Sequence, residues 1–286
     1  MKQILSHLTY IFLGATLLSC EKNVTIDIPS SSPKLVVNCG ITTDSSWSIF
    51  VGRTVPLFDE HTPKYINGAN ISLSADDGTL IPLANTGNGI YTSTQKPLLG
   101  KEYRVEVNVE GFPGVSATCR PLTPPQVELV SKTIKFENGY SSTSVEVRLT
   151  DSKDSEDFYI IEARSPESLI DLNTTYIAYY NLGCDDLACE NVGTDETSKQ
   201  LLFRDRIFSG SKKIIVFTIE GVDYQNTEVE CVIKRCSYDF GEYKRTLFLH
   251  QSNLDSPFSQ PVKIYTNVNN GLGIFASYQS TVIPLY

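Results

Sequence analysis

The chain has few of the residues that carry hydrolytic or metal chemistry. Its 286 residues include three histidines, one tryptophan and one methionine, which is the initiator. The patterns His-Glu-x-x-His, Gly-x-Ser-x-Gly and Gly-x4-Gly-Lys-Ser/Thr are all absent. The chain therefore lacks the usual motifs of zinc peptidases, of hydrolases with a nucleophile elbow and of P-loop enzymes. An enzyme is therefore the least favoured class of function, and no cofactor is expected.

Basic patches are missing as well. The 24 lysines and arginines are outnumbered by 33 aspartates and glutamates, which gives a formal net charge of −9, and nowhere do five like charges follow one another. Nucleic acids and anionic lipid headgroups select clustered lysine and arginine. We therefore expect no nucleic-acid partner. Long windows of Ala, Leu, Glu and Lys are also absent, whereas Val, Ile, Thr and Tyr dominate, which predicts a mainly β protein.

A short apolar run at residues 8–18 is the first feature that is present. It follows Lys2 and ends in the letters LLSC, with the cysteine at Cys20, which is typical of a bacterial lipoprotein signal, although Leu18 stands where a smaller residue is usual. We expect residues 1–19 to be removed, Cys20 to carry a diacylglycerol, and residues 20–32 to form a polar linker. The run is shorter than the roughly 20 residues that cross a bilayer. The alternative is an ordinary secretory signal in which Cys20 has no role.

Two β domains are expected after the linker. Residues 33–122 hold about seven short alternating segments separated by turns, which predicts an immunoglobulin-like β-sandwich. The letters PLTPP at residues 121–125 predict a stiff joint. Residues 123–286 predict a larger C-terminal β domain, with further strands that include residues 262–265.

One helix is predicted in the second domain, because apolar residues there recur at three- and four-residue spacing. Ser237 or Asp239 is available as its N-cap. We expect the helix to pack on the second sheet through the stripe Phe240, Tyr243, Leu247, His250 and Leu254.

Six of the seven cysteines remain if Cys20 is lipidated, an even number in an oxidising compartment. Cys39 lies near the start of the first domain and Cys119 near its end. We predict a disulfide between these two that joins the first and last strands of the domain.

The other four cysteines form two Cys-x4-Cys units. Cys184 and Cys189 flank a loop, and Cys231 and Cys236 lie in one predicted strand. Five residues of strand would separate Cys231 from Cys236 by about 16 Å and point them to opposite faces, so they cannot pair with each other. Pairing between the two units is the natural alternative, while zinc binding and free thiols remain open.

The strand pattern lapses at residues 165–197, and this segment is the candidate partner-binding surface. Tyrosines cluster there and two cysteines bracket an acidic pair. Tyrosines are common interface anchors, and long irregular segments in compact domains are often functional. The candidate contact residues are Tyr176, Tyr179, Tyr180, Asp185 and Asp186. The alternatives are a stapled loop without a ligand and a segment that covers the sheet.

No metal site is predicted. His61 follows Asp59 and Glu60 in a loop that we interpret as solvated, and His250 as a partly buried helix residue. The acidic stretch at residues 151–157 would suit calcium, but it lacks the spacing and glycine of an EF-hand loop, so we interpret it as a solvated turn. Its carboxylates are Asp151, Asp154, Glu156 and Asp157.

Several motifs together resemble the DUF4249 family, lipoproteins of unknown function from Bacteroidota. In the first half they are KLVVNCGIT, GANISLSADDG and GKEYRVEV; in the second half they are LLFRDRIFSG and the closing NVNNGLGIF at residues 267–275. The closing motif reads physically as a tight turn, because Asn-Gly and Leu-Gly pairs tolerate positive φ, with a ligand contact as the alternative. The resemblance implies a cell-envelope lipoprotein, often encoded beside a TonB-dependent receptor, with no established activity.

The leading hypothesis is a non-enzymatic accessory or ligand-capture lipoprotein of the outer membrane that works with a TonB-dependent transporter. The rival is a structural or adhesive cell-surface module. The ligand, and whether the protein faces the periplasm or the surface, are left open by the sequence.

Overall fold

The computed structural model describes residues 32–285 apart from 56–63, 138–139, 154, 167–168, 172–173, 191–198, 223–227 and 255–258. The signal and linker predictions, including lipidation of Cys20, lie outside the described residues, and so does His61. Among the described residues, no helix is long and apolar enough to cross a bilayer.

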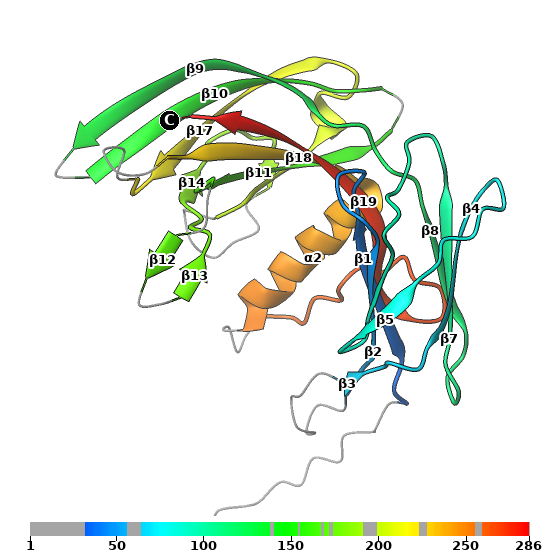
Figure 1. The fold of residues 1–286 in the computed structure, drawn as a ribbon. Helices are drawn as coiled ribbons and strands as arrows, with labels where there is room; N and C mark the ends of the chain where they lie inside the picture. The colour runs from blue at the N-terminus through cyan, green and yellow to red at the C-terminus, as the bar shows by residue number, and fades with distance from the viewer. Residues whose placement is uncertain are drawn as a thin grey trace, which may run out of the picture. The chain divides into compact units, whose positions relative to one another are not determined.

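The fold is mainly β, as predicted, and a ten-stranded sheet runs through it (Figure 1). β3 (Lys64–Tyr65) pairs with β2 at the side of the main path. In spatial order the other strands are β15 (Cys189–Glu190), β16 (Leu201–Arg204), β11 (Asp157–Arg164), β18 (Glu230–Ser237), β19 (Leu272–Pro284), β1 (Leu35–Ile41), β2 (Ser48–Arg53), β6 (Ile90–Thr92) and β5 (Ala84–Gly87).

Three smaller sheets and two helices complete the described chain. The three-stranded sheet has the order β4 (Asn70–Ala75), β7 (Tyr103–Asn108), β8 (Val115–Cys119). The four-stranded sheet has the order β14 (Asn181–Gly183), β17 (Lys212–Glu220), β10 (Tyr140–Thr150), β9 (Gln126–Glu137). The hairpin is β12 (Leu169–Asp171) with β13 (Thr174–Tyr176), and the helices are the 3-10 turn η1 (Asp205–Ile207) and α2 (Tyr238–Leu254).

Two hydrophobic cores form because alternate strand residues turn inward. In β7 every second residue is buried, starting at Tyr103. The first core lies between the β1–β2 part of the large sheet and the three-stranded sheet, and contains Trp47. The second core lies between the β11–β18 part and the four-stranded sheet, and contains Phe217. A two-layer β arrangement is thus present in both halves.

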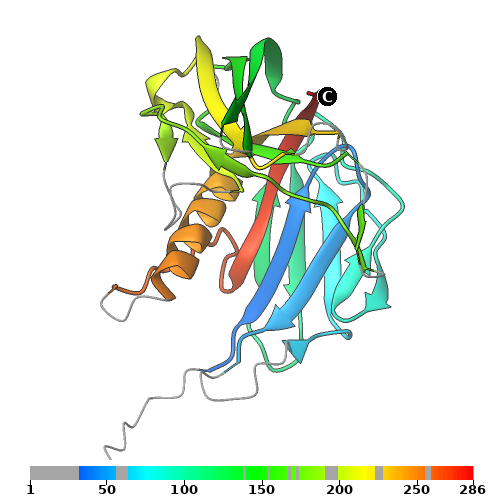
Figure 2. The same ribbon diagram turned by 90° about the vertical axis from the view of Figure 1, so that its left-hand side faces the viewer.

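The last strand joins the two halves, which corrects the predicted domain boundary. β19 pairs in parallel with β1 from Val36↔Leu272 to Ile41↔Ser277, and antiparallel with β18 from Cys236↔Tyr278 to Glu230↔Pro284. Pro33–Tyr286 is one compact unit as a result. The joint at residues 121–125 marks a change of core but does not separate two domains, because the sheet continues across both (Figure 2).

The parallel pairing of β1 and β19 depends on a glycine. Gly273 has φ +106°, and a Cβ there would lie 2.1 Å from the Val37 carbonyl oxygen. Asn270, with φ 60°, turns the chain just before it. The closing motif is therefore a turn that lets β19 start against β1, as its glycines predicted.

The helix is present, but its packing differs from the predicted stripe. Gly241, Glu242 and Thr246 are the buried residues of the described helix, whereas Tyr243 and Leu247 are only partly buried. Apolar contact comes from Phe240, Phe248 and Leu249, which flank the helix face against Phe158 and Leu202. Ser237 is the N-cap, since its Oγ accepts the Phe240 N–H at 3.4 Å.

The strand predicted at residues 262–265 is wrong. This segment runs beside α2 instead: the Tyr265 N–H donates to Thr246 Oγ1 at 2.9 Å, and His250 Nδ1 contacts the Val262 carbonyl oxygen at 3.1 Å. Side chains of the helix satisfy backbone groups here that a strand partner would otherwise satisfy.

Candidate functional site

The predicted partner-binding residues separate into structural and exposed groups. Tyr179 is 38% exposed, and its backbone forms an isolated antiparallel β-bridge with Arg164. Tyr180 packs against the second core. Tyr176 ends β13, and its side chain lies outside the description. Tyr180 therefore contributes to the fold, and the partner-binding role of Tyr176 and Tyr179 stays a prediction.

Asp186 also belongs to the fold. Its Oδ1 accepts the Ala188 N–H at 2.8 Å, its carbonyl oxygen accepts the Cys189 N–H at 2.9 Å, and its Oδ2 pairs with Lys213 Nζ at 2.9 Å. Burial alone would raise the pKa of Asp186, but the bonds from Lys213 and Ala188 outweigh it and lower the pKa. Asp186 therefore builds the turn between the two cysteines, and Asp185 is the exposed member of the pair.

Sequence reasoning missed an exposed apolar residue in the described part of this segment. Leu187, at the tip of this turn, is 99% exposed, and Ile177 nearby in sequence is 38% exposed. The available signal was an apolar residue placed between two acidic residues and the second cysteine. A fully exposed leucine on a hydrogen-bonded turn is an ordered apolar contact point.

The six described cysteines are free thiols, so the predicted Cys39–Cys119 disulfide is not formed in this structure. Both thiols pack in the first core as small apolar groups, and burial raises the pKa of each to about 12.

The two Cys-x4-Cys units do not come together in pairs across the fold. Cys231 faces the second core and Cys236 faces α2, which confirms that they point to opposite faces of one strand. Cys184 and Cys189 instead lie side by side: a hydrogen bond from the Cys189 thiol lowers the pKa of Cys184, and the same bond raises the pKa of Cys189. The pairing expected between the two units is not formed in this structure, where all four thiols are free.

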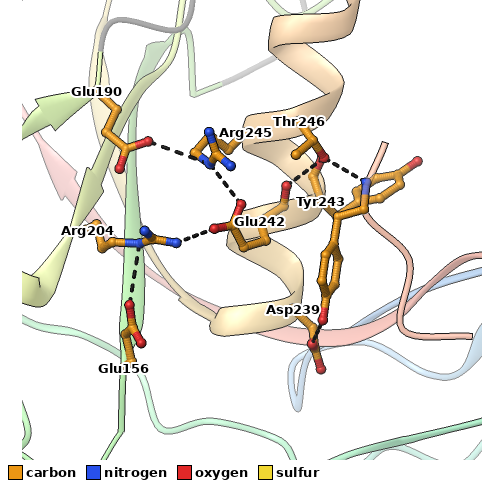
Figure 3. Close-up of polar contacts among 9 residues, drawn as sticks. Glu156, Glu190, Arg204, Asp239, Glu242, Tyr243, Arg245 and Thr246 are labelled. Atoms are coloured by element: carbon orange, nitrogen blue, oxygen red, sulfur yellow. Dashed lines mark hydrogen bonds and ion pairs between the residues drawn. The ribbon is translucent and has the colours of Figure 1, made fainter. Parts of the chain in front are cut away.

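A chain of ion pairs connects β16 to the helix (Figure 3). Arg204 Nε lies 3.5 Å from Glu156 Oε1, and its NH2 bonds to Glu242. Glu242 in turn pairs with Arg245 at 2.8 Å, and Arg245 lies 3.9 Å from Glu190. The network holds two positive and three negative charges, and it anchors the helix to β15 and β16.

The N-terminal end of α2 is tied to the closing motif. Asp239 accepts hydrogen bonds from the Tyr265 hydroxyl and from Asn267 Nδ2, the second at 3.1 Å. Asn267 also exchanges two bonds with the backbone of Phe275, at 2.9 and 3.0 Å. The conspicuous asparagine of the motif is therefore satisfied within the fold and has no need of a ligand.

An open cleft of about 480 Å³ lies where the two halves meet. Arg120 and Leu122 come from the end of the first half, while Glu156, Asp157 and Tyr238 come from the second. Such junctions commonly bind small molecules. The sequence could not indicate this cleft, because its lining residues come from three separate segments.

The acidic stretch is not the solvated turn that was expected. Asp151 and Asp157 are 7% and 1% exposed. Only Glu156 is exposed among the three described carboxylates of that stretch, and Asp154 lies outside the description. The buried pair stands apart from the ion-pair chain of Figure 3.

Comparison with known proteins identifies a family but no activity. The model of the family described as "Domain of unknown function (DUF4249)" matches residues 21–283. No curated protein matches the chain. One solved structure, titled "The Enterococcus faecalis MSCRAMM ACE binds its ligands by the collagen Hug Model", is 8% identical over 87% of this chain and 93% of that chain, with a TM-score of 0.21. A TM-score this low gives no evidence of a shared fold.

Proposed function

The chain belongs to the DUF4249 family, and from this premise we propose that it is an outer-membrane lipoprotein that acts as a non-enzymatic accessory or ligand-capture component of a TonB-dependent transporter. The proposed anchor is Cys20, on the LLSC pattern. The observation that carries the binding role is the exposed turn around Leu187, which is ordered by Asp186 and bears a fully exposed apolar side chain.

This turn has the properties of a protein contact. Burying one leucine contributes about 1.5–3 kcal/mol, which is a large part of what a few central residues contribute to an interface. The backbone bonds of Asp186 fix the turn before binding, so little ordering entropy is lost on association. Tyr179 and Asp185 are the exposed residues that we expect to contact the partner around Leu187.

The lipid anchor would strengthen a weak contact of this size. Confinement to one membrane raises the effective concentration of two partners that share it. The protein would therefore need only a small docking surface when the transporter lies in the same bilayer.

A non-enzymatic role agrees with the burial of two thiols and with the pairing of two carboxylates at the cleft. Burial raises the pKa of Cys39 and Cys119 to about 12, so these two thiols are not nucleophiles at neutral pH. Of the charged residues that line the cleft, Glu156 pairs with Arg204 and Asp157 pairs with Arg235.

The proposal is tested by replacing Leu187 with serine and isolating the full-length protein from detergent-solubilised membranes. We expect a β-barrel receptor to co-purify with the wild type and to be lost from Leu187→Ser, with the melting midpoint unchanged. The matched control is Leu80→Ser, because Leu80 is 68% exposed but lies in the first half. Receptor capture that survives Leu187→Ser, or the absence of any receptor from the wild-type sample, would reject this role.

A structural or adhesive module is the second candidate, and the edge strand β9 favours it. Its twelve residues form one edge of the four-stranded sheet, and Phe136 on it is 72% exposed. Open edges of this kind pair readily with further strands. Val130 sits at the bulge in β9. Replacing it by proline should abolish adhesion or self-association if the protein is a structural or adhesive module. If the protein is not such a module, the substitution should leave receptor capture intact.

A further inference from the structure

Three buried carboxylates meet at one point that no ion pair of Figure 3 includes. Asp151 follows β10, Asp157 opens β11 and Asp205 opens η1. Their exposed fractions are 7%, 1% and 1%, and one carboxylate oxygen from each lies within 4.8 Å of the others. Asp205 is 48 residues from Asp157 in sequence, so the sequence pattern gave no sign of this cluster.

Most of the carboxylate oxygens of the three aspartates already accept at least one hydrogen bond from the protein. Asp157 Oδ2 accepts from Arg235 Nε at 2.7 Å and from Ser155 Oγ at 2.9 Å. Asp205 Oδ2 accepts the Asp157 N–H at 2.8 Å. The two oxygens of Asp151 accept from the Tyr159 hydroxyl at 2.6 Å and from the Gly210 N–H at 2.8 Å. These bonds hold the three carboxylates in fixed orientations.

One oxygen has no partner. Asp157 Oδ1 is fully buried, makes no hydrogen bond, and belongs to one of the three clustered carboxylates. Leaving a buried polar atom unsatisfied costs about 1–3 kcal/mol, and more when the group is charged. A bound cation would satisfy this oxygen.

The net negative charge of the cluster also favours a bound cation. Three ionised carboxylates face one contacting cation, Arg235, which leaves a local charge of about −2. Lys153 and Arg206 line the adjoining cleft together with Glu156, yet neither cation makes an ion pair that the structure records with the three aspartates. A single divalent cation would neutralise the negative charge that Arg235 leaves unbalanced.

We propose that Asp151, Asp157 and Asp205 form a binding site for a hard divalent cation, and that calcium is the cation that fits it. Calcium–oxygen distances are about 2.3–2.6 Å, so two oxygens on one calcium ion lie at most about 5 Å apart, which the 4.8 Å spread satisfies. Magnesium usually keeps several waters and takes only one or two protein carboxylates in near-ideal octahedral geometry, so a set of three fixed carboxylates suits calcium better. An all-oxygen set without nitrogen or sulfur is unsuited to zinc or copper.

Water can complete the coordination from two sides. Asp157 lines the cleft of about 480 Å³, and Asp205 lines a second open cleft of about 380 Å³. Six to eight oxygens surround calcium in proteins, so three carboxylates and several waters form a complete site. The bound cation would join β10, β11 and η1, next to the place where Glu156 meets Arg204.

The test uses the purified full-length protein in detergent after dialysis against a chelator. Calcium titration by calorimetry should show one site with a dissociation constant on the order of 10⁻⁴–10⁻³ M or tighter, the range of extracellular modules. Terbium offers a second readout, because the Tyr159 hydroxyl lies 2.6 Å from Asp151 Oδ1 and should sensitise luminescence of a bound lanthanide. Calcium should quench that signal by competition, and magnesium should quench it less.

The variants Asp157→Asn and Asp205→Asn should each lose at least tenfold in calcium affinity, whereas Asp185→Asn, which changes an exposed carboxylate outside the cluster, should retain it. Asp157→Asn also removes the charge that pairs with Arg235, so Asp205→Asn is the primary variant, and if it does not fold, Asp151→Asn takes its place. A wild type that binds no calcium at millimolar concentration would overturn the site and show that the cluster holds a proton instead. Unchanged affinity in the folded cluster variants would place any bound calcium elsewhere.

Discussion

Asp186 illustrates how one side chain can serve a contact surface without touching a partner. It accepts bonds from Ala188 and Lys213, and these hold Leu187 at the tip of the turn. Asp185, its neighbour in sequence, is exposed. Sequence reasoning selected both aspartates because they lie between cysteines, but it could not tell them apart, because the partner Lys213 comes from another strand.

The role of Asp186 predicts a pH-dependent loss of stability. Its pKa is lower in the folded than in the unfolded chain, so its stabilising contribution is present above the unfolded pKa of about 3.9 and is lost as pH falls through the folded value. Asp186→Asn should therefore lower the free energy of unfolding by roughly 0.5–1 kcal/mol at pH 7, the size of a partly exposed ion pair. The difference from wild type should begin to shrink as pH falls below about 4 and should vanish only below the folded pKa of Asp186.

Urea unfolding at several pH values measures this difference. Asp185→Asn is the control and should cost little at any pH, since that side chain is exposed. A constant deficit of Asp186→Asn across the whole pH range would show that the turn depends on shape and not on the carboxylate charge.

At the scale of elements, the helix shows what periodicity can and cannot predict. Spacing of apolar residues located α2 correctly, because a helix needs a repeat near 3.6 wherever it packs. The buried side of the helix could not be predicted from apolar spacing, since its buried residues are Gly241, Glu242 and Thr246. Glu242 is buried there only because Arg204 arrives from β16 to pair with it (Figure 3).

The contact at Gly241 gives a prediction for the helix. A Cβ at this position would lie 2.1 Å from the Phe158 ring, so Gly241→Ala should force α2 away from β11. Overpacking of this kind costs about 1–3 kcal/mol, which exceeds the gain of up to about 1 kcal/mol from alanine's helix propensity. We expect a net loss of stability in thermal or urea unfolding.

Gly68→Ala is the matched control, because a Cβ at Gly68 meets nothing within 4 Å. It should be neutral or slightly stabilising. If Gly241→Ala instead raised the melting midpoint, the helix would have to sit farther from Phe158 than the structure places it.

At the scale of the whole described unit, local pattern predicted strands but not their partners. The alternation at residues 103–109 predicted β7 closely, because one face of that strand is buried. The parallel pairing of β1 with β19 joins residues more than 230 positions apart and leaves no local trace. The same limitation concealed the approach of Asp205 to Asp157, and it led to the prediction of two domains where one sheet serves both cores.

Because β19 is shared, the two cores should unfold in one cooperative transition. Phe275 on β19 stacks on Trp47 in the first core with ring centroids 6.2 Å apart, while the same strand pairs with β18 beside the second core. Trp47 is the only tryptophan, so its fluorescence reports the first core alone. Leu149→Ala removes a fully buried side chain of the second core and should cost about 2–5 kcal/mol.

We expect Leu149→Ala to shift the midpoint of the Trp47 fluorescence transition by the same amount as the midpoint measured by circular dichroism. Coincidence of the two probes is the test of a single cooperative unit. Val105→Ala, in the first core, is the reciprocal control and should shift both probes together as well. If Trp47 fluorescence in Leu149→Ala kept its wild-type midpoint while circular dichroism shifted, the halves would unfold independently and β19 would join them in structure without coupling their stability.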